Sequence, residues 1–447
     1  MNHTVTVGFA TSLSGRWPRE LPEHRLAEYG TWLKENLADA AVVDFGSLVD
    51  SPARAREAAA RFGEQTVDLV VLVYGAFTGD DISTILAEQL GVPLILWAPY
   101  EPPFTGGRLL ANGLVAAIMN SAAMHRLNQP HHVVYGSLDD PRAAAEVRDL
   151  VAAYRVVKQL RGTVFGLFGY RPTAFYNSTL DEGLIRRTFG IRFEETSLKT
   201  VFDRMASLAD TDVSADMGWI DGKYSGDKVP AGYLRSHSAL YLALGQLMAE
   251  QGYDFGALKC WPEMGNACTT PCAALGRLAD QGRLISCESD IDAGLAMVVQ
   301  NLITGLPPFV TDMINVDETA NTLTFWHCGN AAQSLFADQT QAEIANHPLA
   351  GQGVAFRATL KPGPVTVARF CNIGGVYKLF LIGGTAVATQ MVTPGTMVDV
   401  HIDPPVRHVL TRIIDEGVAH HFSLVWAEVV PQLALVARLL GIPVIEI

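Results

Sequence analysis

The sequence predicts an α/β fold, in which parallel sheets covered by helices are followed by an antiparallel barrel or sandwich. Two observations support this class. In the first 100 residues, largely apolar strands alternate with helix patterns, which is typical of parallel sheets buried on both faces. After about residue 350, short alternating strands are separated by Gly/Pro turns, which is typical of antiparallel sheets.

The first layer is predicted from seven consecutive segments. The expected strands are Val5–Ala10, Ala41–Phe45, Val67–Tyr74 and Pro93–Trp97, and the expected helices are Glu23–Leu37, Pro52–Phe62 and Asp80–Leu90. Right-handed crossovers between such strands give a Rossmann-like or flavodoxin-like layer. The first strand is not followed by a G-x-G-x-x-G motif, because Gly8 and Gly15 are too far apart. The sequence therefore supports no nucleotide cofactor.

The alternation then repeats, and a second α/β domain is expected from about residue 155. Its expected elements, with the segment leading into it, are the strands His132–Tyr135 and Thr163–Phe168 and the helices Pro141–Gln159, Thr200–Leu208 and Ser236–Gln251. We therefore expect an N-terminal α/β domain over 1–155 and a second α/β domain over 156–315.

The last domain is expected over 316–447. The predicted strands are Val354–Leu360, Val365–Phe370, Val376–Ile382, Ala386–Val392 and Met397–Ile402, with turns at Gly374-Gly375, Gly383-Gly384 and Pro394-Gly395. Two helices, Val406–Glu416 and Val429–Leu440, are expected to follow these strands.

Charge and composition exclude several kinds of partner. The net charge is −13 and no Lys/Arg run occurs, so we expect neither nucleic acid nor an anionic membrane surface as a partner. The chain shows no secretory signal and no apolar stretch long enough to cross a membrane. All six cysteines lie in the second half, which favours reduced thiols in a cytoplasmic protein. Only 18% of residues are charged, which favours self-association.

Two carboxylates are predicted to meet at one end of a helix. Glu288 precedes an apolar helix pattern over Ile291–Thr304, which Gly305 ends, and Asp312 follows a short return strand. The helix rises roughly 20 Å at about 1.5 Å per residue. The return over Leu306–Thr311 covers a similar length, roughly 20 Å at about 3.3 Å per residue. Glu288 and Asp312 can therefore finish side by side, where they suit a hard cation.

A histidine segment near the C-terminus supplies a third group. His421 lies in Gly417–Ser423, between the two last predicted helices. One imidazole with two carboxylates makes an oxygen-rich site with open positions. Mn²⁺ or Mg²⁺ suits such a site better than Zn²⁺, which prefers His/Cys-rich tetrahedra.

These segments resemble a known family of sugar isomerases. Cys287–Asp290, the helix ending at Thr304-Gly305, and Phe309–Asp312 are similar to the metal-binding segment of L-fucose isomerases, and the spacing of 312 − 288 = 24 residues matches. Ala419–His421, followed by a helix and Gly441–Val444, is similar to the family's terminal histidine segment. The resemblance covers about 285–315 and 417–445 most closely, and Ser289 stands where the family usually has Asn.

The resemblance implies a metal-dependent aldose–ketose isomerase of the L-fucose/L-arabinose isomerase type. Glu288, Asp312 and His421 would hold Mn²⁺ or another divalent cation such as Mg²⁺ or Co²⁺. Glu288 and Asp312 would also act as the acid/base pair in a reaction through an ene-diolate. The family further implies two Rossmann-like domains with a C-terminal β-barrel domain, a small sugar substrate, and a homo-hexamer or homo-trimer.

Three further residues are expected to contact the sugar. Trp97 ends a predicted strand at the edge where α/β proteins bind ligands, and Trp261 and Glu263 lie in a polar loop. By contrast, Asp290 is expected to cap the Ile291 helix, and His327-Cys328 to pack in a core.

Two other functions stay open from the sequence. One is a non-catalytic sugar-binding protein, which would need no metal. The other is an epimerase or lyase that shares the same metal site, because these reactions begin with the same proton abstraction.

Overall fold

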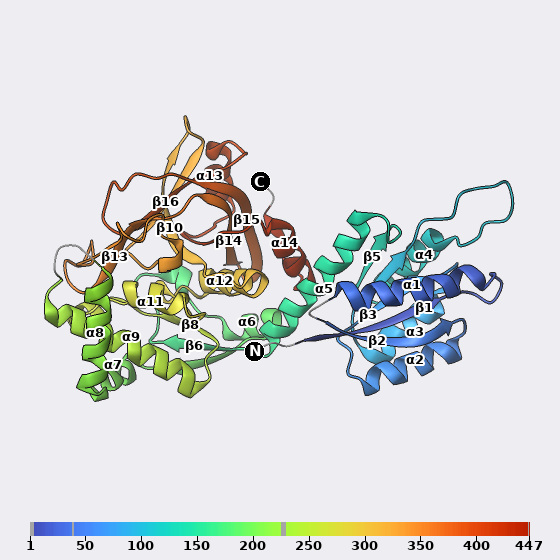
Figure 1. The fold of residues 1–447 in the computed structure, drawn as a ribbon, viewed down its shortest axis with the longest axis horizontal. Coiled ribbons are helices and arrows are strands. Elements are labelled where there is room, and N and C mark those ends of the chain that lie inside the picture. Colours follow the sequence, from blue (N-terminus) through green and yellow to red (C-terminus); the bar gives the residue numbers. More distant parts are fainter. Residues whose placement is uncertain (1–3, 38–39, 225–228, 446) are drawn as a thin grey trace. The chain divides into compact units, whose positions relative to one another are not determined.

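Residues 4–37, 40–224, 229–445 and 447 are described in a computed structural model (Figure 1). Contacts between residues divide the chain into two compact units, 1–158 and 159–447. The first boundary expected from the sequence lies three residues earlier, at 155, inside helix α5 (Pro141–Arg161). Within the described residues, no helix is both long and apolar enough to cross a membrane.

The first unit is a five-stranded parallel sheet with strand order β2-β1-β3-β4-β5. Its strands are β1 (Val5–Ser12), β2 (Ala40–Val49), β3 (Leu69–Tyr74), β4 (Leu94–Ala98) and β5 (His131–Tyr135). Its helices are α1 (Glu20–Asn36), α2 (Pro52–Glu64), α3 (Asp80–Leu90), α4 (Gly113–Arg126) and α5. The strands and helices predicted for this layer are all present.

Helices cover both faces of this sheet. Successive strand residues point to opposite sides, so apolar residues that follow one another in a strand need a helix on each face to bury them. A methyl group placed on Gly8 of β1 would lie 3.2 Å from the ring of Phe62 in α2. The next residue, Phe9, lies against Gly30 of α1, where a methyl group would be 2.9 Å from the Phe9 ring. The two glycines therefore let α2 and α1 pack closely on opposite faces of β1.

The second unit begins with a four-stranded parallel sheet of order β7-β6-β8-β9. Its strands are β6 (Val164–Phe168), β7 (Arg192–Thr196), β8 (Phe255–Leu258) and β9 (Leu284–Ser286). Helices α6 (Glu182–Phe189), α7 (Leu198–Ser207), α8 (Asp210–Lys223), α9 (Ala231–Gln251), α10 (Glu263–Asn266) and α11 (Cys272–Ala279) accompany it. The carboxyl ends of β6, β8 and β9 share one edge, and the loops that follow them carry Tyr170, Trp261 and Glu288.

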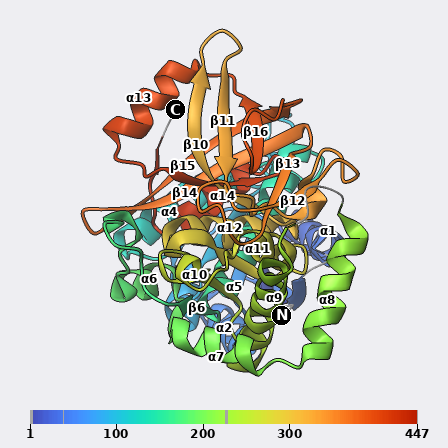
Figure 2. The same cartoon turned by 90° about the vertical axis from the view of Figure 1, so that its left-hand side faces the viewer.

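A closed antiparallel barrel completes the second unit, as the family resemblance implied. Its strands in order are β16 (Thr396–His401), β11 (Thr322–His327), β10 (Phe309–Asp317), β17 (His421–Val425), β14 (Gly363–Ile373) and β15 (Val376–Val387), and β15 pairs back to β16. Three shorter strands, β12 (Glu343–Ala345), β13 (Ala355–Thr359) and β18 (Val444–Ile445), extend the sheet beyond the closed barrel. In Figure 2 the β10–β11 hairpin extends beyond the rest of the barrel.

One predicted turn was wrong, and its correction explains how the barrel closes. Gly383-Gly384 lies inside β15, and the segment after Val387 is not the separate strand that we expected over Ala386–Val392. A methyl group on Gly384 would lie 2.7 Å from the His401 carbonyl oxygen. Without side chains there, β15 can approach β16 and pair with it over Thr385–Val387, while Thr385 and Ala386 still pair with β14.

The expected domain boundary at 315/316 falls inside strand β10. This strand follows helix α12 (Ile291–Thr304), which packs against β9 on one side and against β14 and β17 on the other. The buried Gln300 side chain of α12 donates to the carbonyls of Thr366 and Ser423 and accepts from the Ser423 hydroxyl. The helix therefore joins the parallel sheet and the barrel into one compact unit. Helices α13 (Val406–Asp415) and α14 (Val430–Leu439) complete this unit.

Candidate active site

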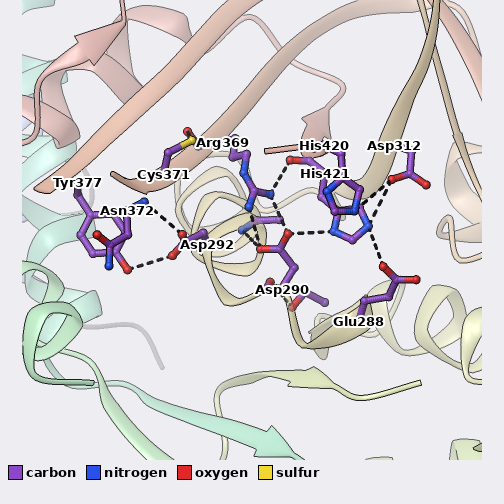
Figure 3. A network of polar contacts seen from close by, with 12 residues as sticks. Glu288, Asp290, Asp292, Asp312, Arg369, Cys371, Asn372, Tyr377, His420 and His421 are labelled. Atoms are coloured by element: carbon purple, nitrogen blue, oxygen red, sulfur yellow. Dashed lines mark hydrogen bonds and ion pairs between the residues drawn. The ribbon is translucent and has the colours of Figure 1, made fainter. Parts of the chain in front are cut away.

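The structure brings together the three residues that the sequence singled out, Glu288, Asp312 and His421 (Figure 3). The Nε2 atom of His421 lies 3.4 Å from Glu288 Oε2 and 3.4 Å from Asp312 Oδ1. The side chain of Asp312 is 26% exposed and that of Glu288 is 18% exposed, whereas that of His421 is only 1% exposed. The site is therefore a half-open pair of carboxylates above a buried imidazole.

The register of two barrel strands places Asp312 beside His421. The two residues are direct partners in the antiparallel pair of β10 and β17, so their side chains lie on the same face. Helix α12 ends at Thr304 and is followed by Gly305, whose φ of 69° is a left-handed conformation that favours glycine. The chain then returns through β10 to the end of the helix where Glu288 lies, as the lengths of the two segments predicted.

Glu288 lies in a backbone conformation that few non-glycine residues adopt. Glu288 and Ser289 have φ values of 56° and 53°. The loop is held by the Ser289 hydroxyl, which donates to the Tyr170 carbonyl at 3.0 Å, and by the Ser286 hydroxyl, which donates to the Asp290 carbonyl at 2.8 Å. Strain of this kind, held by surrounding hydrogen bonds, is concentrated at functional sites.

A buried ion pair fixes the His421 ring. Asp290 accepts from His421 Nδ1 at 2.9 Å and from the Ala293 backbone at 3.0 Å, so it also caps α12, as predicted. Arg369 pairs with both oxygens of Asp290 at 2.9 and 3.2 Å and donates to the His421 carbonyl at 2.7 Å (Figure 3). With Nδ1 bonded to a carboxylate, the Nε2 lone pair faces Glu288 and Asp312.

Two more histidines border the site. The Nε2 atom of His420 lies 3.8 Å from Asp312 Oδ1, and the His327 ring lies 5.5 Å from the His421 ring. We expected His327 to be a core residue, and it is 1% exposed, but its Nδ1 atom has no hydrogen-bond partner among the described residues. The sequence reasoning missed its position because it did not predict β11 (Thr322–His327), in which buried and partly buried residues alternate from Leu323 to His327.

The donor set fits a hard divalent cation. His421 Nε2 is buried and has no hydrogen-bond partner in the described part of the chain. The described residues contain two groups of three side chains whose ligand atoms lie within 4.8 Å of one another, and both include His421: one adds Glu288 and His420, the other Asp312 and His327. Carboxylate oxygens with imidazole suit Mn²⁺ or Mg²⁺.

Burial and mutual contact shift the pKa values of the three groups. Burial opposes the charged form of Glu288, but the adjacent His421 outweighs it and lowers the pKa of Glu288. Burial raises the pKa of Asp312 to about 6. Burial alone would lower the pKa of His421, but Asp290 and Glu288 raise it to about 9. A cation and a proton would therefore compete for the same His421 nitrogen.

Comparison with known proteins indicates the kind of reaction. No family model matches the chain. The sulfoquinovose isomerase of Alkalicoccus urumqiensis is 29% identical over 386 residues, which cover 84% of this chain and 86% of that protein. The sulfoquinovose isomerases of Priestia aryabhattai and of Clostridium sp. (strain MSTE9) are each 26% identical, over 84% and 83% of this chain. This protein is a sugar isomerase, an intramolecular oxidoreductase. The similarity supports a sugar isomerase of the L-fucose isomerase-like kind.

The structure does not support Trp97 as a sugar-binding residue. Its side chain is fully buried in the first unit, where its indole N–H donates to the Gly136 carbonyl at 2.8 Å. The rings of Tyr29 and Trp32 contact it edge-on, with centroids 4.8 and 5.5 Å away. Because β4 lies between two other strands and is covered by helices, this strand end is part of the core.

Trp261 lies in the second unit, which also holds the candidate site. It follows β8, is 38% exposed, and meets the Phe175 ring at 5.4 Å, and Phe175 in turn lies 6.0 Å from the His420 ring. Its exposed face makes it a candidate for stacking on a sugar. Glu263, the first residue of α10, pairs with Lys259 at 2.5 Å, so its carboxylate already has a partner.

Proposed function

We propose that this protein is a divalent-cation-dependent aldose–ketose isomerase whose substrate is a sulfonated sugar of the sulfoquinovose type. The observation that carries the proposal is the buried, unpartnered Nε2 of His421, which lies between the carboxylates of Glu288 and Asp312. The names of the relatives supply the substrate class.

Glu288, Asp312 and His421 are the residues that would hold the cation. When bound, a divalent cation such as Mn²⁺ would polarise the sugar carbonyl and stabilise the negative charge of an ene-diolate. Asp290 and Arg369 hold the imidazole so that its free nitrogen faces the two carboxylates. The strained loop of Glu288 and the pairing of β10 with β17 fix the carboxylates before substrate arrives.

The two carboxylates would also move the protons. In the forward direction, one takes the proton from C2, the C1–C2 double bond forms, and O1 gains a proton. The C2 hydroxyl then loses its proton, the C2 carbonyl forms, and C1 gains a proton, so the ketose has the same atoms as the aldose. Glu288 and Asp312 approach His421 Nε2 from two directions, each at 3.4 Å. This arrangement suits one carboxylate to move the proton on carbon and the other to move the proton on the oxygens.

The test is Glu288→Gln, measured with sulfoquinovose and added Mn²⁺. We expect turnover to fall about 100- to 10,000-fold, because the variant loses an acid/base group. We also expect the amount of bound metal, measured by elemental analysis, to fall. Glu195→Gln, an exposed residue of the edge strand β7, is the matched control.

Three results would contradict the proposal. They are full turnover by Glu288→Gln, no metal bound by the wild-type protein, and no ketose in the product. An epimeric aldose in the product would instead indicate an epimerase, and binding without turnover would indicate a sugar-binding protein.

We further propose that the protein forms a homo-oligomer, a hexamer or a trimer, in the cytoplasm. Supporting this, helix α4 exposes the apolar side chains of Leu114, Val115 and Ile118, which are 38%, 48% and 61% accessible. Exposed apolar residues that adjoin one another are typical of association surfaces. Native mass spectrometry would give the number of subunits, and a monomer would contradict this part of the proposal.

A further inference from the structure

We propose that Arg171 binds the sulfonate of the substrate and so decides whether the enzyme prefers a sulfonated sugar to an uncharged one. This inference rests on the proposed function. It adds a residue that none of the sequence motifs pointed to.

Arg171 lies in the loop next to Glu288. This loop follows β6, and its Tyr170 carbonyl accepts the hydrogen bond from Ser289, the residue directly after Glu288. The same loop continues to Phe175, whose ring contacts both Trp261 and His420. The segment that carries Arg171 is therefore joined at one end to the Glu288 loop and at the other to a histidine of the site.

The guanidinium of Arg171 is held in place without being neutralised. It lies over the rings of Tyr170 and Tyr176, 5.7 and 5.2 Å from their centroids, and donates to the Pro172 carbonyl at 3.3 Å. Its Nε is shielded from solvent and has no partner, and no carboxylate of the described residues pairs with it. A preorganised cation with unused donors is suited to an anionic ligand.

Two other cations in the described part of this unit, Arg369 and Lys259, already have carboxylate partners. Arg369 is 1% exposed and pairs with Asp290, as Figure 3 shows, and Lys259 pairs with Glu263. The chain as a whole carries a net charge of −13, which repels an anionic substrate. A sulfonated sugar therefore requires a local cation, and among the described residues of the loops that follow β6, β8 and β9, Arg171 is the cation without a carboxylate partner.

The chemistry of the sulfonate favours an arginine. A sulfonate stays ionised at all physiological pH values and presents three equivalent oxygens, two of which match the parallel N–H donors of a guanidinium. In sulfoquinovose it lies at the end of the carbon chain opposite the C1–C2 pair that isomerises. Its binding group should therefore lie beside the carboxylates and not between them, and the loop that carries Arg171 is hydrogen-bonded to the Glu288 loop.

The test compares Arg171→Gln and Arg171→Lys with wild type on sulfoquinovose and on 6-deoxyglucose, the same sugar without the sulfonate. We expect Arg171→Gln to raise KM for sulfoquinovose about 10- to 100-fold, because the variant loses charge-assisted hydrogen bonds to the sulfonate. The kcat should be nearly unchanged. Arg171→Lys should recover part of the loss. Activity on 6-deoxyglucose and Mn²⁺ affinity should not change. Arg186→Gln, an exposed arginine on α6, is the control.

Binding of sulfoquinovose, measured by calorimetry on the Mn²⁺-loaded protein, separates this inference from the proposed function. If wild type binds the sulfonated sugar but produces no ketose, the isomerase proposal fails while Arg171 can still be tested by binding. If Arg171→Gln binds sulfoquinovose as tightly as wild type does, the Arg171 proposal is overturned. It is also overturned if the variant loses metal and activity on both sugars together, because Arg171 would then only support the loop.

Discussion

At the scale of single residues, Asp290 shows how one side chain serves two neighbours. It caps α12 through the Ala293 backbone, and it also bonds His421 Nδ1 and Arg369. It is completely buried, and the charge of Arg369 helps to lower its pKa against the effect of burial. Carboxylates behind a metal-binding histidine fix the ring and increase its basicity.

Asp290→Asn tests this role. The amide keeps the shape but loses the charge, so His421 is held less firmly and Arg369 loses its counter-ion. We expect the dissociation constant for Mn²⁺ to rise about 10- to 100-fold, measured by calorimetry. Asp203→Asn, whose carboxylate pairs with Lys199 on the surface, should leave it unchanged. Unchanged Mn²⁺ affinity in Asp290→Asn would refute the role.

At the scale of elements, the closure of the barrel depends on where β15 can approach β16. The sequence predicted a turn at Gly383-Gly384 because paired glycines often interrupt strands. The structure uses them for a close approach instead: after Gly384, the residues Thr385–Val387 pair with β16. A local signal for flexibility cannot distinguish a turn from a close contact, since the contact partner lies elsewhere in the sequence.

Gly384→Ala should therefore loosen the barrel. The new methyl group would lie 2.7 Å from the His401 carbonyl oxygen, and we expect the free energy of unfolding to fall by about 1–3 kcal/mol in urea titrations. Gly218→Ala in α8 is the matched control, because a methyl group placed on Gly218 would have no neighbouring atom within 4 Å and because alanine favours helices. Equal stability of Gly384→Ala and wild type would show that the barrel accommodates the side chain.

At the scale of the whole molecule, the second unit combines a parallel sheet and a barrel around long-range contacts. One of these involves a buried histidine: His237 of α9 is 1% exposed and lies 3.2 Å from Arg277 of α11. Burial and the charge of Arg277 lower the pKa of His237 to about 3. In the unfolded chain the same group takes up a proton near its usual pKa of about 6.5.

This difference predicts how stability depends on pH. The contribution of neutral His237 to the free energy of unfolding is complete above about pH 6.5 and is lost as pH falls toward 3. In that range only the unfolded chain binds the proton, so protonation favours unfolding. Relative to His237→Gln, wild type should lose about 1.4 kcal/mol more of its unfolding free energy per pH unit there. Urea titrations at several pH values would measure this. Parallel curves for wild type and His237→Gln would contradict it, and His408→Gln, an exposed control on α13, should resemble wild type.

Local patterns in the sequence were enough to predict several features of the fold and the site. Alternating strands and helices predicted the first sheet, residues of known capping preference predicted the end of α12 and its cap at Asp290, and matching segment lengths predicted that Glu288 and Asp312 finish together. Each of these depends on residues close in the chain, where backbone geometry and side-chain preferences suffice.

Contacts between residues far apart in the sequence could be found only in the folded structure. These include the pairing of Arg369 with Asp290, the strand that carries His421, the burial of Trp97 between two strands, and the place of His327 beside the site. Each depends on which strands become neighbours when the sheets form. Which strands pair is decided by the burial of whole apolar surfaces, so it cannot be inferred from the residues nearby in the sequence.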